Sequence, residues 1–195
     1  ELAVPLARTR QVVLFDHRGL GASHGTGDED VTIELMAHDV LRLCQALHLR
    51  VVHLLGFSMG GLVAQAILSH PDAQPTPDEA GVVIHGIEVR RVIPPATFTK
   101  SPRTEFRLDG AAIPDDATRT ERAMAQLQYM LAMQYHPAVL GEGRPMQHKM
   151  DARMRRGLAA RRPLNTMARQ AVAIAIYQGR DRLRYVPRHL PIAIL

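Results

Sequence analysis

One serine, placed between a predicted strand and a predicted helix, constrains this chain more than any other feature. Residues Val51–Phe57 form a short apolar run, typical of a strand buried on both faces. The turn Gly56–Gly61, with the sequence G-F-S-M-G-G, follows it, and helical spacing continues from there to His70. A G-x-S-x-G pattern is frequent by chance but becomes specific between a strand and a helix. The sequence therefore predicts Ser58 at the tip of a sharp turn.

This turn has the residues that nucleophilic chemistry needs. A serine at its tip exposes the Oγ atom to a substrate carbonyl, and flanking glycines such as Gly56 and Gly60 permit both a strained turn and a close helix–sheet approach. The N–H of Met59, at the start of the helix, would point at the oxyanion that develops during attack. We interpret Ser58 as a candidate nucleophile and Met59 as an oxyanion-hole donor.

The other segments predict an α/β architecture. Strands, helices and turns alternate up to about residue 113, which is typical of a parallel sheet. Beyond Pro114 the chain becomes helical and rich in methionine, and a last strand begins at Ile192. The expected strands are Gln11–Phe15, Val51–Phe57 and one within Gly86–Ile93, with Val82–Ile84 as a short extra piece. The expected helices are Thr32–His48 (with Thr32 as N-cap and Cys44 on its core stripe), Gly60–His70, Thr118–His136, Met146–Arg162 and Leu164–Gln178. The segment Gln74–Glu79 is an expected loop.

Three features in order resemble the α/β-hydrolase superfamily, in its proline-iminopeptidase, esterase and haloperoxidase-like branch with a helical cap. These are D-x-R-G-x-G-x-S at residues 16–23 after a strand, the helix carrying Asp39, and the turn around Ser58. The resemblance covers essentially the whole chain and implies an α/β-hydrolase fold, incomplete here, whose mostly parallel sheet carries a cap insertion. It divides the chain into a core fragment (1–113), a helical cap or lid (114–186) and the start of the returning core strand (187–195).

The resemblance also implies an activity. It makes Ser58 the nucleophile, Met59 a source of one oxyanion-hole N–H, and Gly56 and Gly60 the elbow glycines. Because a serine stands where epoxide- and halide-cleaving relatives have aspartate, it implies cleavage of an ester, amide, thioester or carbon–carbon bond through an acyl-enzyme. The expected partner is a small-molecule acyl substrate, and no cofactor is expected. The loop with Asp16 is structural in the family.

Two members of the expected catalytic triad have no counterpart in this chain. The family order is serine, then an acid, then histidine, and the acid follows the strand that begins here at Ile192. None of the ten histidines stands where the base is expected, and the early strand ending in His-Gly should precede Glu1. We therefore expect a fragment of a longer hydrolase. Two hypotheses stay open: a serine hydrolase in the full-length protein, or a catalytically incomplete, non-enzymatic hydrolase-like chain.

Composition excludes several other classes of function. The formal net charge is +5, but the arginines concentrated in residues 153–162 have no interleaved aromatic residues, so a solvated helix face is expected rather than nucleic-acid binding. No apolar run reaches the ~18–20 residues that cross a bilayer. A single cysteine, Cys44, excludes an internal disulfide and points to the cytoplasm. The spacing of the histidines predicts no metal site. Oligomeric state and substrate identity are not indicated.

Overall fold

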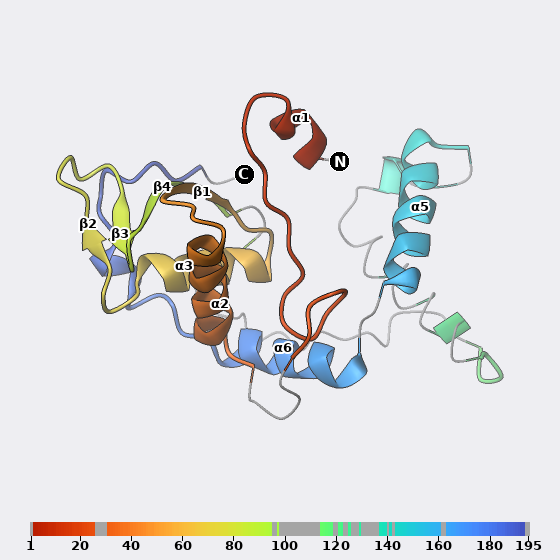
Figure 1. Cartoon of the computed structure of the whole chain (residues 1–195). Helices are drawn as coiled ribbons and strands as arrows, with labels where there is room; N and C mark the ends of the chain where they lie inside the picture. Colours follow the sequence, from red (N-terminus) through yellow and green to blue (C-terminus); the bar gives the residue numbers. More distant parts are fainter. Residues whose placement is uncertain are drawn as a thin grey trace. The chain divides into compact units, whose positions relative to one another are not determined.

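The protein divides into two compact units, which Figure 1 shows in a computed structural model. The first unit comprises Glu1–Pro102 and Arg162–Leu195, and the second comprises Arg103–Arg161. The structure describes residues 2–25, 31–94, 97, 114–118, 121–122, 125, 129, 137–139, 141, 143–160 and 163–193.

The first unit contains both helices and strands, and β1 lies between α2 and α3 along the chain, as expected for an α/β protein. Its elements are α1 (Ala3–Ala7), α2 (Ile33–Ala46), β1 (Val51–Leu55), α3 (Met59–Leu68), β2 (Gln74–Pro75), β3 (Val82–Ile84), β4 (Ile87–Ile93), α6 (Leu164–Ile176) and η2 (Leu183–Tyr185).

The sheet has the strand order β1-β4-β3-β2. Strand β1 runs parallel to β4, whereas β2, β3 and the first half of β4 pair in antiparallel fashion. At the start of the predicted last strand, Ile192 forms an isolated parallel bridge with Val92. Val92 donates its N–H to the carbonyl of Pro191 at 3.1 Å and accepts from Ala193 at 3.1 Å. The returning chain therefore lies beside the second half of β4, parallel to it.

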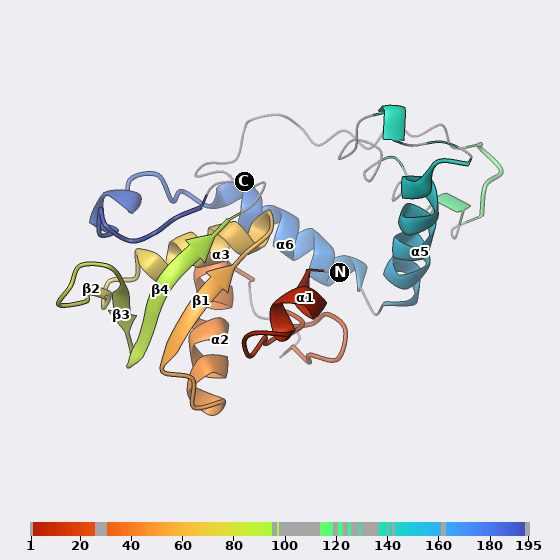
Figure 2. The ribbon, with the colours of Figure 1, turned by 90° about the horizontal axis from the view of Figure 1, so that it is seen from above.

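Helices α2 and α3 lie on one face of the sheet (Figure 2). The apolar stripe of α2 is buried at Ile33, Met36, Val40 and other positions of the same face. Helix α3 is buried along Gly61–Leu68, consistent with its apolar composition on every side. Both predicted helices are therefore confirmed, with ends that differ by one to two residues.

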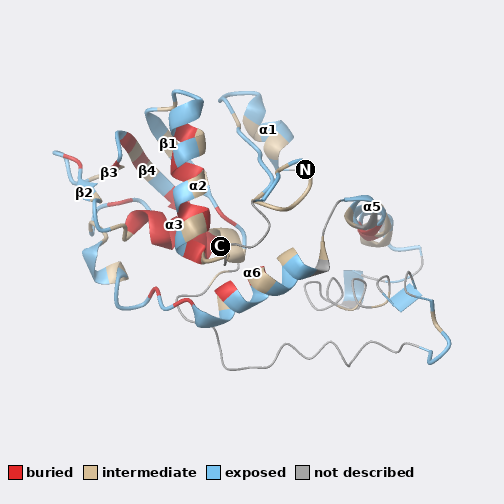
Figure 3. Cartoon of the chain, turned by 60° about the horizontal axis from the view of Figure 1, so that its bottom comes forward, coloured by how far each residue is buried: buried red, intermediate tan, exposed pale blue. Residues whose placement is uncertain are grey.

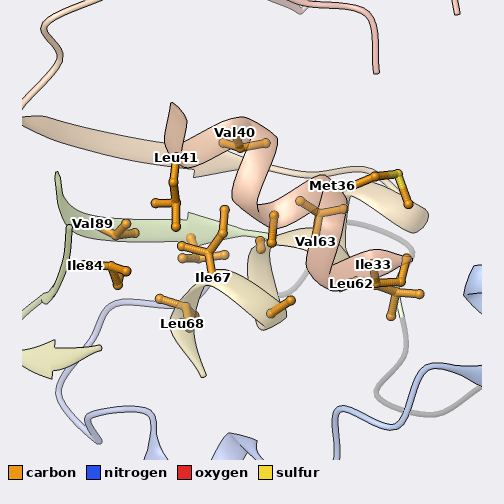
Figure 4. Packing of buried hydrophobic residues seen from close by; sticks show 14 of the residues in the cluster. Ile33, Met36, Val40, Leu41, Leu62, Val63, Ile67, Leu68, Ile84 and Val89 are labelled. Carbon is orange, nitrogen blue, oxygen red and sulfur yellow. The ribbon is translucent and has the colours of Figure 1, made fainter. Parts of the chain in front are cut away.

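The hydrophobic core lies between these helices and the sheet, where the buried residues gather in Figure 3. Figure 4 shows the side chains of α2 and α3 packed together and against the residues of β3 and β4. Cys44 is buried in this core, as its place on the α2 stripe predicts. Helix α6 joins the core through Ala173, and Tyr177 follows it. The residues labelled in Figure 4 are Ile33, Met36, Val40, Leu41, Leu62, Val63, Ile67, Leu68, Ile84 and Val89.

Helix α2 begins with the predicted cap, since the hydroxyl of Thr32 accepts the N–H of Leu35 at 3.0 Å. We expect Thr32→Ala to lower the free energy of unfolding by about 1 kcal/mol, because that N–H loses its partner. Urea unfolding measures the change. Thr32→Ser retains the acceptor oxygen and is expected to behave almost like the native protein. Equal unfolding midpoints for the Ala and Ser variants would contradict the capping role.

Three expectations about the strands are wrong. The expected loop Gln74–Glu79 begins with the short strand β2, which pairs with β3. Gln11–Phe15 forms no strand, and Leu14 is 77% exposed. A strand-type sequence needs a neighbour for its backbone hydrogen bonds, and no described strand pairs with this segment. Strand β1 is also not buried on both faces: exposure alternates along it, and Val51 and Leu55 are exposed. The helices cover one face of β1, and the other is open.

The second unit contains η1 (Pro137–Val139) and α5 (Pro145–Ala159). Met150 and Met154 of α5 are buried, whereas Arg153, Arg155 and Arg156 are exposed, as predicted for a solvated arginine face. Most of the predicted helix Thr118–His136 lies outside the described residues. Helix α6, which the sequence groups with the cap, belongs to the first unit. No described helix combines the length and apolar character that a membrane crossing requires.

Candidate active site

Ser58 occupies a strained turn between β1 and α3. Its φ of 51° and ψ of −112° are unusual for a residue with a side chain. Strained conformations of this kind are retained where the surrounding structure fixes them, and they cluster at functional sites. The strand, the turn and the helix thus place Ser58 as the G-x-S-x-G pattern predicts.

Two glycines make this turn sterically possible. A Cβ atom at Gly56 would overlap the backbone carbonyl of Gly60 and lie 2.8 Å from the nitrogen of Gly61. A Cβ at Gly61 would lie 2.5 Å from the Cβ of Thr97. At Gly60 a Cβ would meet no described atom within 4 Å. Close approach therefore requires glycine at positions 56 and 61, whereas the expected need for glycine at position 60 has no steric support among the described atoms.

Hydrogen bonds hold the turn but leave the proposed reactive groups unengaged. Gly60 donates to the carbonyl of Phe57 at 2.8 Å, Gly61 donates to that of Ser58 at 2.9 Å, and the Thr97 hydroxyl donates to the same Ser58 carbonyl at 2.9 Å. The Ser58 hydroxyl caps no N–H of α3. The Met59 N–H donates to no backbone acceptor within the described part of the chain. The roles of both groups in binding a substrate stay predictions.

A cavity of about 380 Å³ lies beside the turn. Ser58 and Met59 line it together with the segment from Val13 to Phe15 and His17. Most of its remaining walls are aliphatic or aromatic side chains from α2, β1, α3 and the turn between β1 and α3, including Val40, Leu54, Leu55, Phe57, Val63 and Ile67. An apolar cavity of this size can accommodate a small apolar group.

His17 is the one histidine that lines this cavity among the described residues. Burial lowers the pKa of its imidazole, and the nearby carboxylates of Asp39 and Asp16 oppose this shift only in part. Its buried Nδ1 has no hydrogen-bond partner in the described residues, and its ring packs edge-on against Phe15 with centroids 5.1 Å apart. The imidazole is therefore neutral at neutral pH.

The lowered pKa of His17 predicts an acid-sensitive fold. As pH falls through 6.5, the unfolded chain takes up a proton at His17 before the folded chain does, so the free energy of unfolding decreases until the folded pKa is reached. We expect urea midpoints to fall less between pH 7.5 and pH 5.5 in His17→Gln than in the native protein. His53, whose pKa is also lowered by burial and by Arg91 and Arg10, titrates in both proteins. An identical acid-induced loss in the variant would contradict the prediction.

The loop preceding α2 is held by its own charged residues. The Asp16 carboxylate accepts the N–H of Ala22 at 3.0 Å, and a Cβ at Gly21 would overlap this carboxylate. Arg18 forms a bidentate ion pair with Asp39 of α2: its Nε lies 2.6 Å from Oδ2 of Asp39, and its Nη2 lies 2.5 Å from Oδ1. These contacts support the structural role predicted for Asp16 and Arg18.

The residues that the structure describes do not complete a catalytic triad. No hydrogen bond joins the Ser58 hydroxyl to a histidine within the ranges that the structure describes. His17 and Ser58 line the same cavity although 41 positions separate them along the chain, so the sequence alone does not predict that they share it. The roles of Ser58 as nucleophile and Met59 as oxyanion donor therefore stay predictions, and the expected acid and base stay unassigned.

A serine turn between a parallel strand and a buried helix is characteristic of α/β-hydrolase folds. A family profile described as the alpha/beta hydrolase fold matches residues 1–138. The chain belongs to the alpha/beta hydrolase fold family. The predicted fold class is thereby confirmed.

Two curated proteins match shorter segments. "Putative carbamate hydrolase RutD" of Caulobacter sp. (strain K31) is 41% identical over 63 residues, which is 32% of this chain and 24% of that protein. The protein with the same name in Agrobacterium fabrum (strain C58 / ATCC 33970) is 40% identical over 53 residues, which is 27% of this chain and 20% of that protein. The chain therefore spans about a quarter or less of the length of these curated relatives.

A solved structure agrees with the fold over the whole chain. The crystal structure of a hydrolase from Pseudomonas aeruginosa PA01 superposes with a TM-score of 0.62 at 20% identity, covering 100% of this chain and 75% of that one. At this identity the likeness establishes the fold alone.

Proposed function

We propose that Ser58 is the nucleophile of a serine hydrolase that attacks an acyl carbon and forms an acyl-enzyme. The observation that carries the proposal is the strained conformation of Ser58, at φ 51° between β1 and α3, with its hydroxyl not used as a helix cap. Attack by Oγ forms the bond to the acyl carbon, the leaving group departs with a proton, and water later releases the acid. Met59 supports the step by offering its N–H to the oxyanion.

The proposed substrate is a small molecule with an apolar acyl portion. The apolar walls of the 380 Å³ cavity beside Ser58 favour such a group and offer few charged partners. Ester, amide and thioester carbonyls fit this chemistry, and so do carbon–carbon bonds next to a carbonyl. The names of the two RutD relatives add carbamates, whose carbonyl carbon is open to the same attack.

The missing base and acid belong, in this proposal, to a longer protein. Strand β1, strand β4 and the bridge at Ile192 are parallel, so their carboxyl ends meet at one edge of the sheet. Ser58 stands at that edge, after β1. A loop that follows the strand at Ile192 would begin at the same edge, where an acid could serve the site.

The alternative function is a catalytically incomplete chain that binds without turnover. The observation favouring it is that no described histidine is hydrogen-bonded to Ser58, and a serine without a base is a weak nucleophile. The two functions concern different molecules, the full-length protein and the 195-residue chain.

Covalent labelling tests the proposal. A fluorophosphonate probe applied to the full-length protein is expected to modify Ser58, as peptide mass spectrometry would show, and Ser58→Ala is expected to remove the label. Ser69→Ala is a matched control at the other end of α3, since that hydroxyl donates to the carbonyl of Gln65 at 2.8 Å. Undiminished labelling of Ser58→Ala would overturn the proposal.

A further inference from the structure

Two histidines and an aspartate meet at the end of α3 that lies away from Ser58. Each of His70, Asp72 and His85 offers one ligand atom, and these three atoms lie within 4.8 Å of one another. The Nε2 of His85 is 3.0 Å from Oδ2 of Asp72, and the Nδ1 of His70 is 3.8 Å from the same oxygen. We propose that His70, Asp72 and His85 form a binding site for a divalent transition-metal ion such as Zn²⁺.

The first half of the site is built by the turn that follows α3. His70 accepts the N–H of Ala73 through its carbonyl at 2.9 Å, and Pro71 occupies the second position of this turn. The turn brings the imidazole of His70 and the carboxylate of Asp72 to the same side of the chain. The Asp72 N–H also donates to Nδ1 of His70 at 3.1 Å. A metal ion would replace this amide proton at the Nδ1 lone pair.

The second half is the two-residue turn between β3 and β4. His85 and Gly86 have φ values of 50° and 80°, which define the tight hairpin turn that matches the twist of two antiparallel strands. The carbonyl of His85 accepts the side-chain amide of Gln45 from α2 at 3.1 Å, which fixes the turn against the core. His85 is therefore presented to the α3 turn by a short hairpin between buried strands.

The geometry of these three side chains fits coordination of a transition-metal ion better than it fits a simple ion pair between them. The two imidazole rings meet edge to face with centroids 4.9 Å apart, so the single carboxylate faces two nitrogen ligands. In a tetrahedral zinc site with bonds of about 2.0–2.2 Å, neighbouring ligand atoms are roughly 3.3–3.5 Å apart, close to the separations at Asp72. Imidazole ligands favour Zn²⁺, Co²⁺, Ni²⁺ or Cu²⁺ over Mg²⁺ or Ca²⁺.

The site would be open to solvent. The side chains of His70 and His85 are 26% and 33% exposed, and that of Asp72 is 68% exposed, so water would occupy the remaining position. The ten residues of α3 place the cluster about 15 Å from Ser58. A bound ion would tie the α3 turn to the β3–β4 hairpin and stabilise the fold there, independently of the proposed catalysis.

Zn²⁺ titration of the untagged protein tests the site. We expect one saturable site, measured by competition with a chromophoric chelator, and affinities at least about tenfold lower in His85→Asn and His70→Asn, since each loses one of three ligands. Both variants preserve the local fold: asparagine tolerates the positive φ at 85, and its Oδ1 can accept the Asp72 N–H at 70. His189→Asn is the control, because Nε2 of His189 lies 3.9 Å from a Glu79 carboxylate oxygen without a third described ligand.

A second measurement needs no variant. In NMR spectra of the native protein, Zn²⁺ is expected to shift the Asp72 amide and the rings of His70 and His85, and a chelator should reverse the shifts. No saturable site, shifts elsewhere only, or equal affinity in His85→Asn and the native protein would each overturn the proposal. Fluorophosphonate labelling of Ser58 in the same samples reports the proposed hydrolase site separately.

Discussion

Gly56→Ala is expected to prevent the protein from reaching its native fold. The added methyl group would overlap the carbonyl of Gly60 and lie 2.8 Å from the nitrogen of Gly61, and all of these are backbone atoms at the start of α3. Relief requires β1 and α3 to separate, although α3 is the most buried helix of the first unit. We expect a loss of at least about 3 kcal/mol, a large part of the 5–15 kcal/mol that stabilises a typical domain.

The matched control for Gly56→Ala is four residues away. Gly60→Ala adds the same methyl group where no described atom lies within 4 Å, and alanine is favoured over glycine in a helix by about 1 kcal/mol. Unfolding by urea, followed by circular dichroism, should show a native-like or higher midpoint for Gly60→Ala. If Gly56→Ala and Gly60→Ala have the same urea midpoint, the close approach at Gly56 does not determine the stability of the contact between β1 and α3.

Ser58→Ala is expected to abolish turnover in the full-length protein. Loss of a nucleophile that acts with a base costs about 10⁶ in kcat in a well-studied serine hydrolase, and we expect an effect of that order on hydrolysis of a nitrophenyl ester. KM should change little, because the apolar cavity walls are untouched. If Ser58→Ala hydrolyses the ester at the native rate, another group must carry out the reaction.

The 195-residue chain should behave differently in the same assay. Without a described base beside Ser58, its ester hydrolysis is expected to stay near the uncatalysed background, with or without the Ser58 hydroxyl. Robust turnover that disappears in Ser58→Ala would refute the catalytically incomplete alternative. His17→Gln would then be the next variant, since His17 lines the cavity that Ser58 lines.

Patterns confined to a short stretch of sequence predicted the central fold well. The periodic apolar residues of α2, its Thr32 cap, the strand–serine–helix order and the short piece at β3 all follow from neighbours a few positions apart. Local spacing carries this information because helix and strand periodicity are properties of adjacent residues. The geometry at Gly56 is likewise implied by the G-x-S-x-G turn.

Features that depend on distant partners could not be predicted. The segment Gln11–Phe15 has the composition of a buried strand, yet pairing decides whether a strand forms, and no described strand pairs with it. The grouping of His70, Asp72 and His85 needs a turn and a hairpin that meet in space, so the histidine spacing alone predicts no metal site. The return of α6 to the first unit likewise depends on tertiary contacts of Ala173.

The open side of β1 has a practical consequence for anyone who purifies this polypeptide. Strand β1 stands at the end of the strand order, and Val51 and Leu55 leave apolar surface uncovered on it, near the exposed side chain of Leu14. Uncovered strand edges of this kind are templates for intermolecular β-pairing. We therefore expect concentrated samples to form oligomers through β1, and we expect Val51→Lys to reduce oligomer formation.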